Sequence, residues 1–420
     1  MKYRMVKALV RFLSFLMAAL ATQTALAAGF YLSEVGTPSS LGTGGVANPT
    51  NTNGADSSWT NPAGMTGLQE DQIVGGFQFI LPSVKFDSSI ATGGGSDGDN
   101  AGEPVVAPSF FYVNKFSDRL RLGFSLAGTQ GGGVDYGDDF VGRYSVQRAE
   151  LTAIALSPSL GFKVNDRLSL GAGVSILYTR LDEDIAINPA VVPTFSGGDG
   201  QLKIEEATDW GYQPFLGMTY QLTDRALLGI VYRAEMDVNL DGDVKTRNLP
   251  GLIRVDSIEL DWDNPQWLEA GLRYKLDDKN MMFLNAGWQE WSTFSDNTLA
   301  FSGGALDPAV TVDREWDDTW HAGIAFTHFD GGHGTSIGFS YDSSPVEDDR
   351  RTFDFPVDEI YKGSFSYFWK GDKHLDFAVG GTLYMIGDAK VDQSSQGVRA
   401  KGEFDTNYIL FAGGTLRYTF

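Results

Sequence analysis

Four basic residues stand out as groups that could bind an anion. Arg143, Lys163, Arg233 and Arg417 lie in or beside segments with strand-like alternation, and each can donate charge-assisted hydrogen bonds to a carboxylate. The alternative is that they pair with acidic residues that face the lumen, such as Glu235. The chemistry that these residues indicate is therefore the binding of an acidic head group.

The histidines do not indicate a metal centre. The chain has four histidines and no cysteine, and the histidines do not cluster in the way that metal ligands do. We therefore expect no metal, no cofactor and no catalytic residue. A barrel hydrolase is an alternative, because His321 shares its predicted inward face with Ser and Asp residues. The four histidines are His321, His328, His333 and His374.

The first 27 residues have the pattern of a cleaved export signal. Basic residues between Lys2 and Arg11 precede an apolar run, and small residues around Ala27 follow it. The apolar run is shorter than the roughly 20 residues that span a bilayer. We therefore predict a signal peptide over residues 1–27 and an exported mature chain.

The composition indicates an all-β protein. The chain contains 51 glycines and 13% aromatic residues and has few runs of helix-forming residues, which is typical of many short strands. The net charge of −22 argues against a nucleic-acid partner, because phosphate backbones require patches of Lys and Arg.

Residues 71–420 contain stretches in which apolar and polar residues alternate. In the last stretch, Tyr408, Leu410 and Leu416 fall on one face, and Thr415 and Arg417 fall on the other. The same period of two recurs around residues 120–126, 168–179 and 319–326. A strand shows this pattern when one face meets lipid and the other a polar lumen, although a soluble sandwich shows it too.

The lengths of the connections between strands distinguish the membrane barrel from the soluble sandwich. Six short turns alternate with seven long polar stretches, roughly residues 87–103, 129–145, 188–207, 241–256, 294–317, 343–358 and 387–405. Thirteen connections join fourteen strands and place every long loop on the same side, which is the asymmetry of outer-membrane barrels. The sequence therefore predicts an all-β fold, a 14-stranded antiparallel transmembrane β-barrel.

The segment before the first strand predicts a plug. Residues 28–70 are rich in Gly, Asn, Ser and Thr and lack alternation, and a barrel of this size is too wide for side chains alone to fill. We therefore expect an N-terminal hatch or plug over residues 28–70 inside a barrel of residues 71–420. Within it, Asn61 suits a helix N-cap and Pro62 the first helical position. The alternative, a general diffusion porin, would need no plug.

The location follows from export and from closure of the sheet. A sheet that spans a membrane cannot keep unpaired edges, so we expect many crossings of the outer membrane of a Gram-negative bacterium, in contact with its lipid. Phe420 ends an alternating strand, as is common in outer-membrane proteins, and we expect the outer-membrane assembly machinery to recognise it. We expect a monomer.

Several stretches resemble the FadL-type long-chain fatty acid transporters and their relatives for aromatic hydrocarbons. These stretches are AGFYLSEVG at the predicted mature start, NPAGM at residues 61–65, NDRLSLGAGVSILY at residues 165–178 and NPQWLEAGLRYKLDDKNMMFLNAGWQEWS at residues 264–292. The resemblance implies a fourteen-stranded barrel with a hatch, lumen sites for hydrophobic ligands, and passive uptake. It makes Asn61, Pro62 and Ala63 a hatch motif.

The resemblance also implies an inward kink in the third strand that opens the barrel wall sideways. The matching strand is residues 119–130, followed by Gly131, Gly132 and Gly133. Glycine permits a bend or bulge in a strand, so Gly123 and Gly128 are the candidates for the opening. A flexible loop entry is the alternative interpretation of the glycine run.

Seven inward positions of the alternation are apolar, which a water-filled porin wall would not favour. We take them as candidates for lining a ligand path: Leu177, Phe215, Trp267, Phe368, Tyr384, Ile409 and Phe411. The predicted function is an outer-membrane channel for passive uptake of hydrophobic small molecules, with long-chain fatty acids as first choice and monoaromatic hydrocarbons as the alternative. A general porin and a hydrolase remain less favoured alternatives.

Deletion of residues 33–60 tests the plug. We expect the deletion to raise leakage of small polar solutes and to abolish selective uptake, because an unblocked lumen of this width passes water and ions. Sensitivity of cells to large antibiotics reports the leak. Unchanged sensitivity in cells that insert the shortened barrel would contradict the predicted plug.

Overall fold

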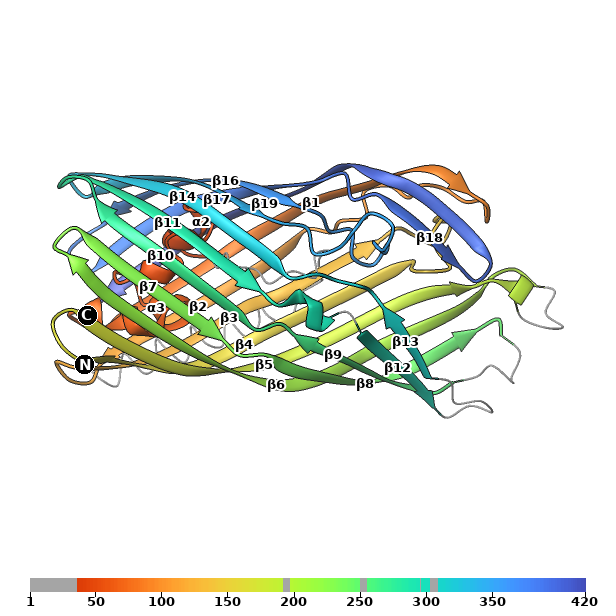
Figure 1. The fold of residues 1–420 in the computed structure, drawn as a ribbon, viewed down its shortest axis with the longest axis horizontal. Helices are drawn as coiled ribbons and strands as arrows, with labels where there is room; N and C mark the ends of the chain where they lie inside the picture. Colours follow the sequence, from red (N-terminus) through yellow and green to blue (C-terminus); the bar gives the residue numbers. More distant parts are fainter. Residues whose placement is uncertain (1–35, 192–196, 250–254, 295, 303–308) are drawn as a thin grey trace.

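The chain forms one closed, elongated β-barrel (Figure 1). The computed structural model describes residues 36–420 except 192–196, 250–254, 295 and 303–308. The predicted signal peptide and the start of the predicted plug lie outside the described residues. Among the described residues, no helix has both the length and the apolar character needed to cross a bilayer.

The barrel wall has fourteen antiparallel strands, as the connection pattern predicted. Four wall strands are each interrupted once, so that β7 and β8, β9 and β10, β11 and β12, and β13 and β14 each make one strand of the wall, and β18 is a short strand that pairs with β19 in an outer loop. The segments are β1 (Gln72–Ala91), β2 (Val105–Lys115), β3 (Leu120–Asp135), β4 (Arg148–Lys163), β5 (Leu168–Ile187), β6 (Gly200–Thr223), β7 (Ala226–Arg233), β8 (Met236–Arg247), β9 (Ser257–Asn264), β10 (Trp267–Lys275), β11 (Asn280–Gln289), β12 (Asp296–Ser302), β13 (Ala309–Asp313), β14 (Thr319–Asp330), β15 (His333–Asp342), β16 (Ile360–Lys370), β17 (Leu375–Ile386), β18 (Val391–Ser395) and β19 (Val398–Thr419).

The first and last strands close the cylinder. Gln72 of β1 lies opposite Thr419 of β19, and the antiparallel ladder runs from there to the outer end. Beyond β19, the backbone N–H of Phe420 donates a hydrogen bond to the carbonyl of Asp71 at 3.1 Å. Closure satisfies the backbone groups of strands that would otherwise be sheet edges in lipid.

The outer wall is apolar, in line with the predicted alternation. Leu216 is 56% exposed, whereas its neighbour Phe215 is fully buried, which shows that successive side chains of β6 point to lipid and to the lumen. Many other large apolar side chains are likewise exposed along the wall, among them Phe77, Phe79, Leu268, Ile337, Phe365 and Leu410. An apolar surface of this extent requires a lipid environment.

The loops sort to the two ends as predicted, but the strands run further than the sequence indicated. The stretch 129–145, predicted as a loop, begins inside β3, which continues to Asp135, and residues 200–207 belong to β6. The predicted loops 241–256, 294–317 and 387–405 also contain strand segments. Polar side chains do not prevent pairing, because backbone amides above the membrane still gain from continuing the ladder.

The long loops pack into an apolar core of their own at the outer end. The rings of Tyr136 and Phe140 stack at 4.1 Å between centroids, and Phe86, Phe353 and Phe404 pack around them. The hydroxyl of Tyr136 donates a hydrogen bond to the carbonyl of Phe353 at 2.9 Å. The outer mouth is therefore covered by packed loops on this side, unlike the open mouth that a porin needs.

Residues 36–68, which we call the plug, lie inside the barrel at the end with the short turns (Figure 1). The plug has four short helical turns, α2 (Pro38–Leu41), η1 (Asn48–Thr50), α3 (Ser57–Thr60) and η2 (Pro62–Gly67). A short turn at residues 189–191 (η3) and another at Trp291–Phe294 (η5) lie outside the plug, between strands.

Glycines of the wall let the plug backbone approach closely. A β-carbon on Gly229 would lie 1.9 Å from the carbonyl oxygen of Pro49, and one on Gly171 would lie 2.4 Å from the backbone nitrogen of Ala63. Since any other residue would collide with the plug backbone, these positions of β7 and β5 accept glycine only.

Asn61 caps η2 and ties the plug to the wall. Its side-chain oxygen accepts a hydrogen bond from the backbone N–H of Ala63 at 3.1 Å, and Pro62 occupies the first helical position, which confirms the sequence prediction. The side-chain amide also donates to the carbonyls of Pro49 at 2.6 Å and Met218 at 3.1 Å. One buried amide thus joins two turns of the plug to β6.

The variant Asn61→Ala should loosen the plug without unfolding the barrel. It removes an N-cap and two further buried hydrogen bonds, a loss of about 2 kcal/mol in plug stability. Hydrogen exchange of amides within residues 36–68 should become faster, whereas exchange in the wall strands should not change. Asn53→Ala is the matched control, because Asn53 is exposed in the same segment. Equal exchange in the two variants would contradict the anchoring role.

Candidate functional site

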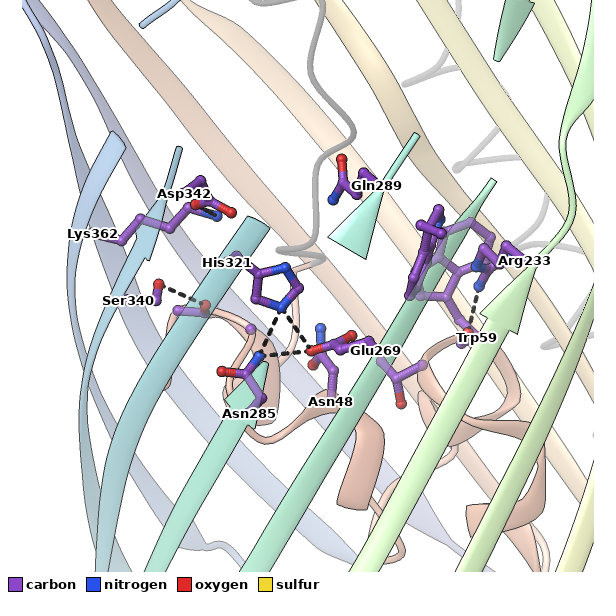
Figure 2. A pocket seen from close by; sticks show the side chains of 14 residues that line it. Asn48, Trp59, Arg233, Glu269, Asn285, Gln289, His321, Ser340, Asp342 and Lys362 are labelled. Atoms are coloured by element: carbon purple, nitrogen blue, oxygen red, sulfur yellow. Dashed lines mark hydrogen bonds and ion pairs between the residues drawn. The ribbon is translucent and has the colours of Figure 1, made fainter. Parts of the chain in front are cut away.

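A small polar pocket lies in the lumen where the plug meets strands β7, β10, β11, β14, β15 and β16. Its volume is about 40 Å³. Figure 2 shows the side chains of the barrel wall around it, with the plug ribbon below. The plug contributes Gly44, Gly45, Asn48, Trp59 and Thr60 to its lining.

Three side chains from neighbouring strands make a polar cluster in this pocket. Asn285 donates a hydrogen bond to Glu269 at 2.7 Å, and the Nε2 atom of His321 lies 3.5 Å from Glu269 and 3.3 Å from the amide nitrogen of Asn285. Glu269 is buried, so its charge depends on these partners rather than on water. The cluster holds the wall side of the pocket in a fixed arrangement (Figure 2).

Lys362 supplies a buried positive charge on the other side of the pocket. Its Nζ atom lies 3.0 Å from a carboxylate oxygen of Asp342 and 4.6 Å from the centre of the Tyr384 ring, and the residue is only 8% exposed. The ammonium group therefore stands at the border between the polar pocket and an aromatic wall. Lys362 is not among the residues predicted from the sequence, although its inward phase with Ser364 and Ser366 could have indicated it.

Arg233 joins the plug to the wall. Its guanidinium donates to the carbonyl of Trp59 at 2.6 Å and to the hydroxyl of Ser175 at 3.0 Å, and it stacks on the rings of Trp59 and Phe215 at 3.9 and 4.4 Å. The predicted alternative pairing with Glu235 is wrong, because Glu235 is exposed and clusters with Asp237 and Asp263 instead. Residues two apart share a face in an unbroken strand, but β7 ends at Arg233 and β8 begins at Met236, so the alternation is interrupted between Arg233 and Glu235.

The other three basic candidates lie elsewhere. Arg143 is in an outer loop and pairs with Asp199 at 2.7 Å, and Lys163 pairs with Asp166 at a short turn at 2.9 Å. Arg417 lies 3.7 Å from Asp376 near the opposite end of the barrel. Of the four, only Arg233 lines the polar pocket.

An apolar cluster adjoins the polar pocket. Tyr384, Ile409 and Phe411 pack with Leu41 of the plug and with Ile80 and Ile360, and the rings of Tyr384 and Phe411 are 4.6 Å apart. Because Lys362 contacts Tyr384, the cluster begins where the buried charge ends. We call the residues Leu41, Ile80, Ile360, Tyr384, Ile409 and Phe411 the apolar wall.

The seven predicted ligand-lining residues all face the lumen, but they do not form one site. Three belong to the apolar wall, and Phe215 and Trp267 surround Arg233. Leu177 packs in the large core that includes Trp59 of the plug. Phe368 lies apart from the others, in a cavity at the end with the short turns. Contact of these residues with a ligand stays a prediction.

The ladder between β2 and β3 stops part-way along the wall. Ser109 of β2 pairs with Ala127 of β3. The four residues that precede Ser109 in β2, residues 105–108, pair with β1 and not with β3 in the described ladders. On the other side, β3 stays paired with β4 through a bulge between Gly128 and Gln130. The wall therefore separates at Gly128.

The two glycine candidates have different roles. A β-carbon on Gly128 would have no atom within 4 Å, whereas one on Gly123 would lie 2.4 Å from the sulfur of Met65 in the plug. Gly123 also keeps its pairing with Val113, so the break is not there. Gly131, Gly132 and Gly133, predicted to follow the strand, lie within β3.

The break lies beside the apolar wall. Val105 and Ala107, which have lost their partners on β3, pack against the apolar wall from inside the barrel. Val106 is 45% exposed on the outside. An apolar surface thus runs from Lys362 to the separation in the barrel wall.

A third cavity of about 200 Å³ lies toward the outer loops. Leu151, Leu181, Trp262 and Phe294 line it with other apolar side chains, and an ion pair joins Arg314 to Asp354 at 2.7 Å. Burial raises the pKa of Asp354, but the charge of Arg314 outweighs burial and holds the pKa below its ordinary value. The carboxyl groups of Glu150 and Glu183 also line this cavity. A mostly apolar pocket suits transient contact with a hydrophobic molecule.

The hydrolase alternative finds no support in the geometry. Residues 334–338, Gly-Thr-Ser-Ile-Gly, have the letters of a nucleophile elbow, but they lie inside β15 and not at a strand-to-helix turn. Ser336 shares a hydrogen bond with Thr327 at 2.8 Å. His321 contacts Glu269 and Asn285.

Comparison with known proteins shows the family to which the chain belongs. Residues 18–420 match the profile of the family described as outer membrane protein transport protein (OMPP1/FadL/TodX). The chain belongs to this family. It is therefore an outer-membrane transport protein that crosses the membrane many times as a β-barrel, as the resemblance in the sequence implied.

Individual relatives agree in length and fold. A long-chain fatty acid transport protein of Escherichia coli is 22% identical over 436 residues, covering 96% of each chain. The crystal structure of a Pseudomonas aeruginosa FadL homologue has a TM-score of 0.85 at 21% identity, covering 94% of this chain and all of that one. The Pseudomonas putida toluene transporter TodX has a TM-score of 0.70 at 18% identity, covering 93% and 99%.

Proposed function

We propose that the protein takes up long-chain fatty acids passively across the outer membrane. The single observation that supports this most is the contact between buried Lys362 and the apolar wall at Tyr384. A carboxylate can bind the ammonium group by a charge-assisted hydrogen bond, while its chain lies along the apolar side chains. The polar pocket of about 40 Å³ holds a head group and no more.

The proposed path begins at the outer loops and ends in the membrane. A hydrophobic molecule first meets the cavity between Trp262 and Phe294, then binds above the plug between Lys362 and Phe411, and leaves sideways where β2 and β3 separate. The plug blocks direct passage of water and polar solutes. The driving force is the concentration difference alone.

Monoaromatic hydrocarbons are the second candidate. The similarity to the toluene transporter TodX supports them, and the apolar wall alone would suit a ligand without a head group. The difference lies in Lys362, since a neutral hydrocarbon cannot form the charge-assisted hydrogen bond that a carboxylate makes with a buried ammonium group. Equilibrium binding of oleate and of toluene to the purified barrel in detergent distinguishes the two ligand classes, and tighter binding of toluene would overturn the first choice.

The variant Lys362→Gln tests recognition of the carboxylate. We expect about tenfold weaker binding of oleate, or ~1.4 kcal/mol, and unchanged binding of methyl oleate, which carries no charge. Lys362→Arg keeps a cation and is the matched control. An equal loss for oleate and its methyl ester would mean that Lys362 acts only on the structure of the pocket.

Deletion of Thr129 tests the sideways exit. Thr129 is the extra residue of the bulge in β3, so its removal lets β3 continue in one register with β4 and extend its pairing to β2. We expect uptake of labelled oleate by cells to fall while binding to the purified protein persists. Thr129→Ala, which keeps the bulge, should transport normally. Undiminished uptake in the deletion variant would exclude this exit.

A further inference from the structure

A further cavity lies on the other side of the plug from the polar pocket. It has a volume of about 430 Å³ and is bounded by the plug and by the turn-side ends of β10 to β19. Gly332 and Lys370, at two of the short turns, belong to its rim. The proposed uptake path does not use this cavity.

Apolar side chains from five strands line the cavity. Phe283, Phe329 and Phe368 point inward from β11, β14 and β16, and the rings of Phe329 and Phe368 meet at 5.4 Å between centroids. Val74 of β1, Trp369 of β16, and Phe377 and Ala378 of β17 add to the apolar lining. This explains the inward position of the apolar side chain of Phe368, although Phe368 lies far from the apolar wall.

The charges around the cavity are mainly positive. Arg273, Lys370 and Arg417 line it, against the single carboxylate of Asp376. Arg273 is held in place by hydrogen bonds to the carbonyl of Thr50 at 3.2 Å and the hydroxyl of Thr52 at 2.8 Å. In a chain with a net charge of −22, an excess of cations beside an apolar cavity favours an anionic ligand.

We propose that this cavity is a second binding site, on the periplasmic side of the plug, for a single-chain anionic amphiphile of the fatty acid class. The choice of ligand class rests on the proposed function. The volume falls in the range of small-molecule pockets, roughly 300–1,000 Å³. The acyl chain lies against Phe283, Phe329 and Phe368, and the carboxylate faces Arg417 and Lys370.

The plug then separates two sites of the same chemical class. Gly44, Trp59 and Thr60 face the polar pocket, and Thr43, Ala47 and Asn51 face the lower cavity. The two surfaces belong to one segment only a few residues thick. The lower site gives fatty acid a place on the periplasmic side, separate from the sideways exit between β2 and β3.

Photolabelling of the full-length mature protein tests the second site. A palmitate with a diazirine at the chain end is bound to the purified barrel, irradiated, and mapped by mass spectrometry, with and without excess oleate. We expect oleate-sensitive labelling at two places, near Phe411 above the plug and near Phe283 or Phe329 below it. Labelling on the lipid-facing surface should not respond to oleate.

Two variants remove the lower site selectively. Ala378→Phe fills the cavity, and Val379→Phe is its control, because Ala378 is buried and points inward whereas Val379 is 49% exposed to lipid. We expect Ala378→Phe to abolish the lower label and to leave the upper label unchanged. Arg417→Gln should reduce lower labelling about tenfold for the carboxylate probe and leave that of the corresponding alcohol probe unchanged.

The outcomes separate this inference from the proposed function. Upper labelling without oleate-sensitive lower labelling in the unmodified protein overturns the second site and leaves the proposed function intact. Lower labelling alone supports the second site and overturns the proposed uptake path. Lower labelling that persists in Ala378→Phe overturns the second site, because the probe is then not in the cavity.

Discussion

The backbone hydrogen bonds between β1 and β19 are the interaction on which the rest of the structure depends. Inside a bilayer an unpaired N–H or C=O group costs several kcal/mol, so a spanning sheet must close, and here it closes with fourteen strands. A barrel of this width leaves a lumen that wall side chains do not fill. The apolar outer face, the buried plug and the cavities around it all follow from that closure.

The plug is held by contacts that require small residues and buried charges in the wall. Gly171 and Gly229 let its backbone touch the strands, and Arg233 binds the carbonyl of Trp59 while stacking on its ring. These contacts add to the apolar packing of plug side chains such as Leu41 and Trp59 against the wall, because a short segment rich in Gly, Asn, Ser and Thr cannot build a core of its own. They also divide the lumen, so that apolar and charged side chains line one region above the plug and another region below it.

The interruption of the wall at Gly128 departs from the rule of full pairing, and its surroundings limit the cost. Beyond the bulge, β3 stays hydrogen-bonded to β4. On the other side of the break, residues 105–108 of β2 stay paired with β1. Pro108 has no N–H to leave unpaired. Because the apolar wall lies directly inside the break, the separated strands face apolar side chains there.

The sequence alone determined the fold class, the strand number, the sides on which short and long loops lie, the N-cap at Asn61 and the inward phase of Phe411 and its companions. These properties follow from local rules, the period of two in strands and the preferences of turns and caps, which hold at every residue independently of its distant neighbours. Tertiary structure decided which inward residues meet. In the folded barrel, Lys362 contacts Tyr384 and Phe368 lies below the plug. Arg143 and Lys163 lie away from the lumen site. The pairing between β2 and β3 ends at Gly128 and not at Gly123. Those outcomes depend on the register between strands and on the position of the plug. The alternation of apolar and polar residues within a single strand specifies neither of them.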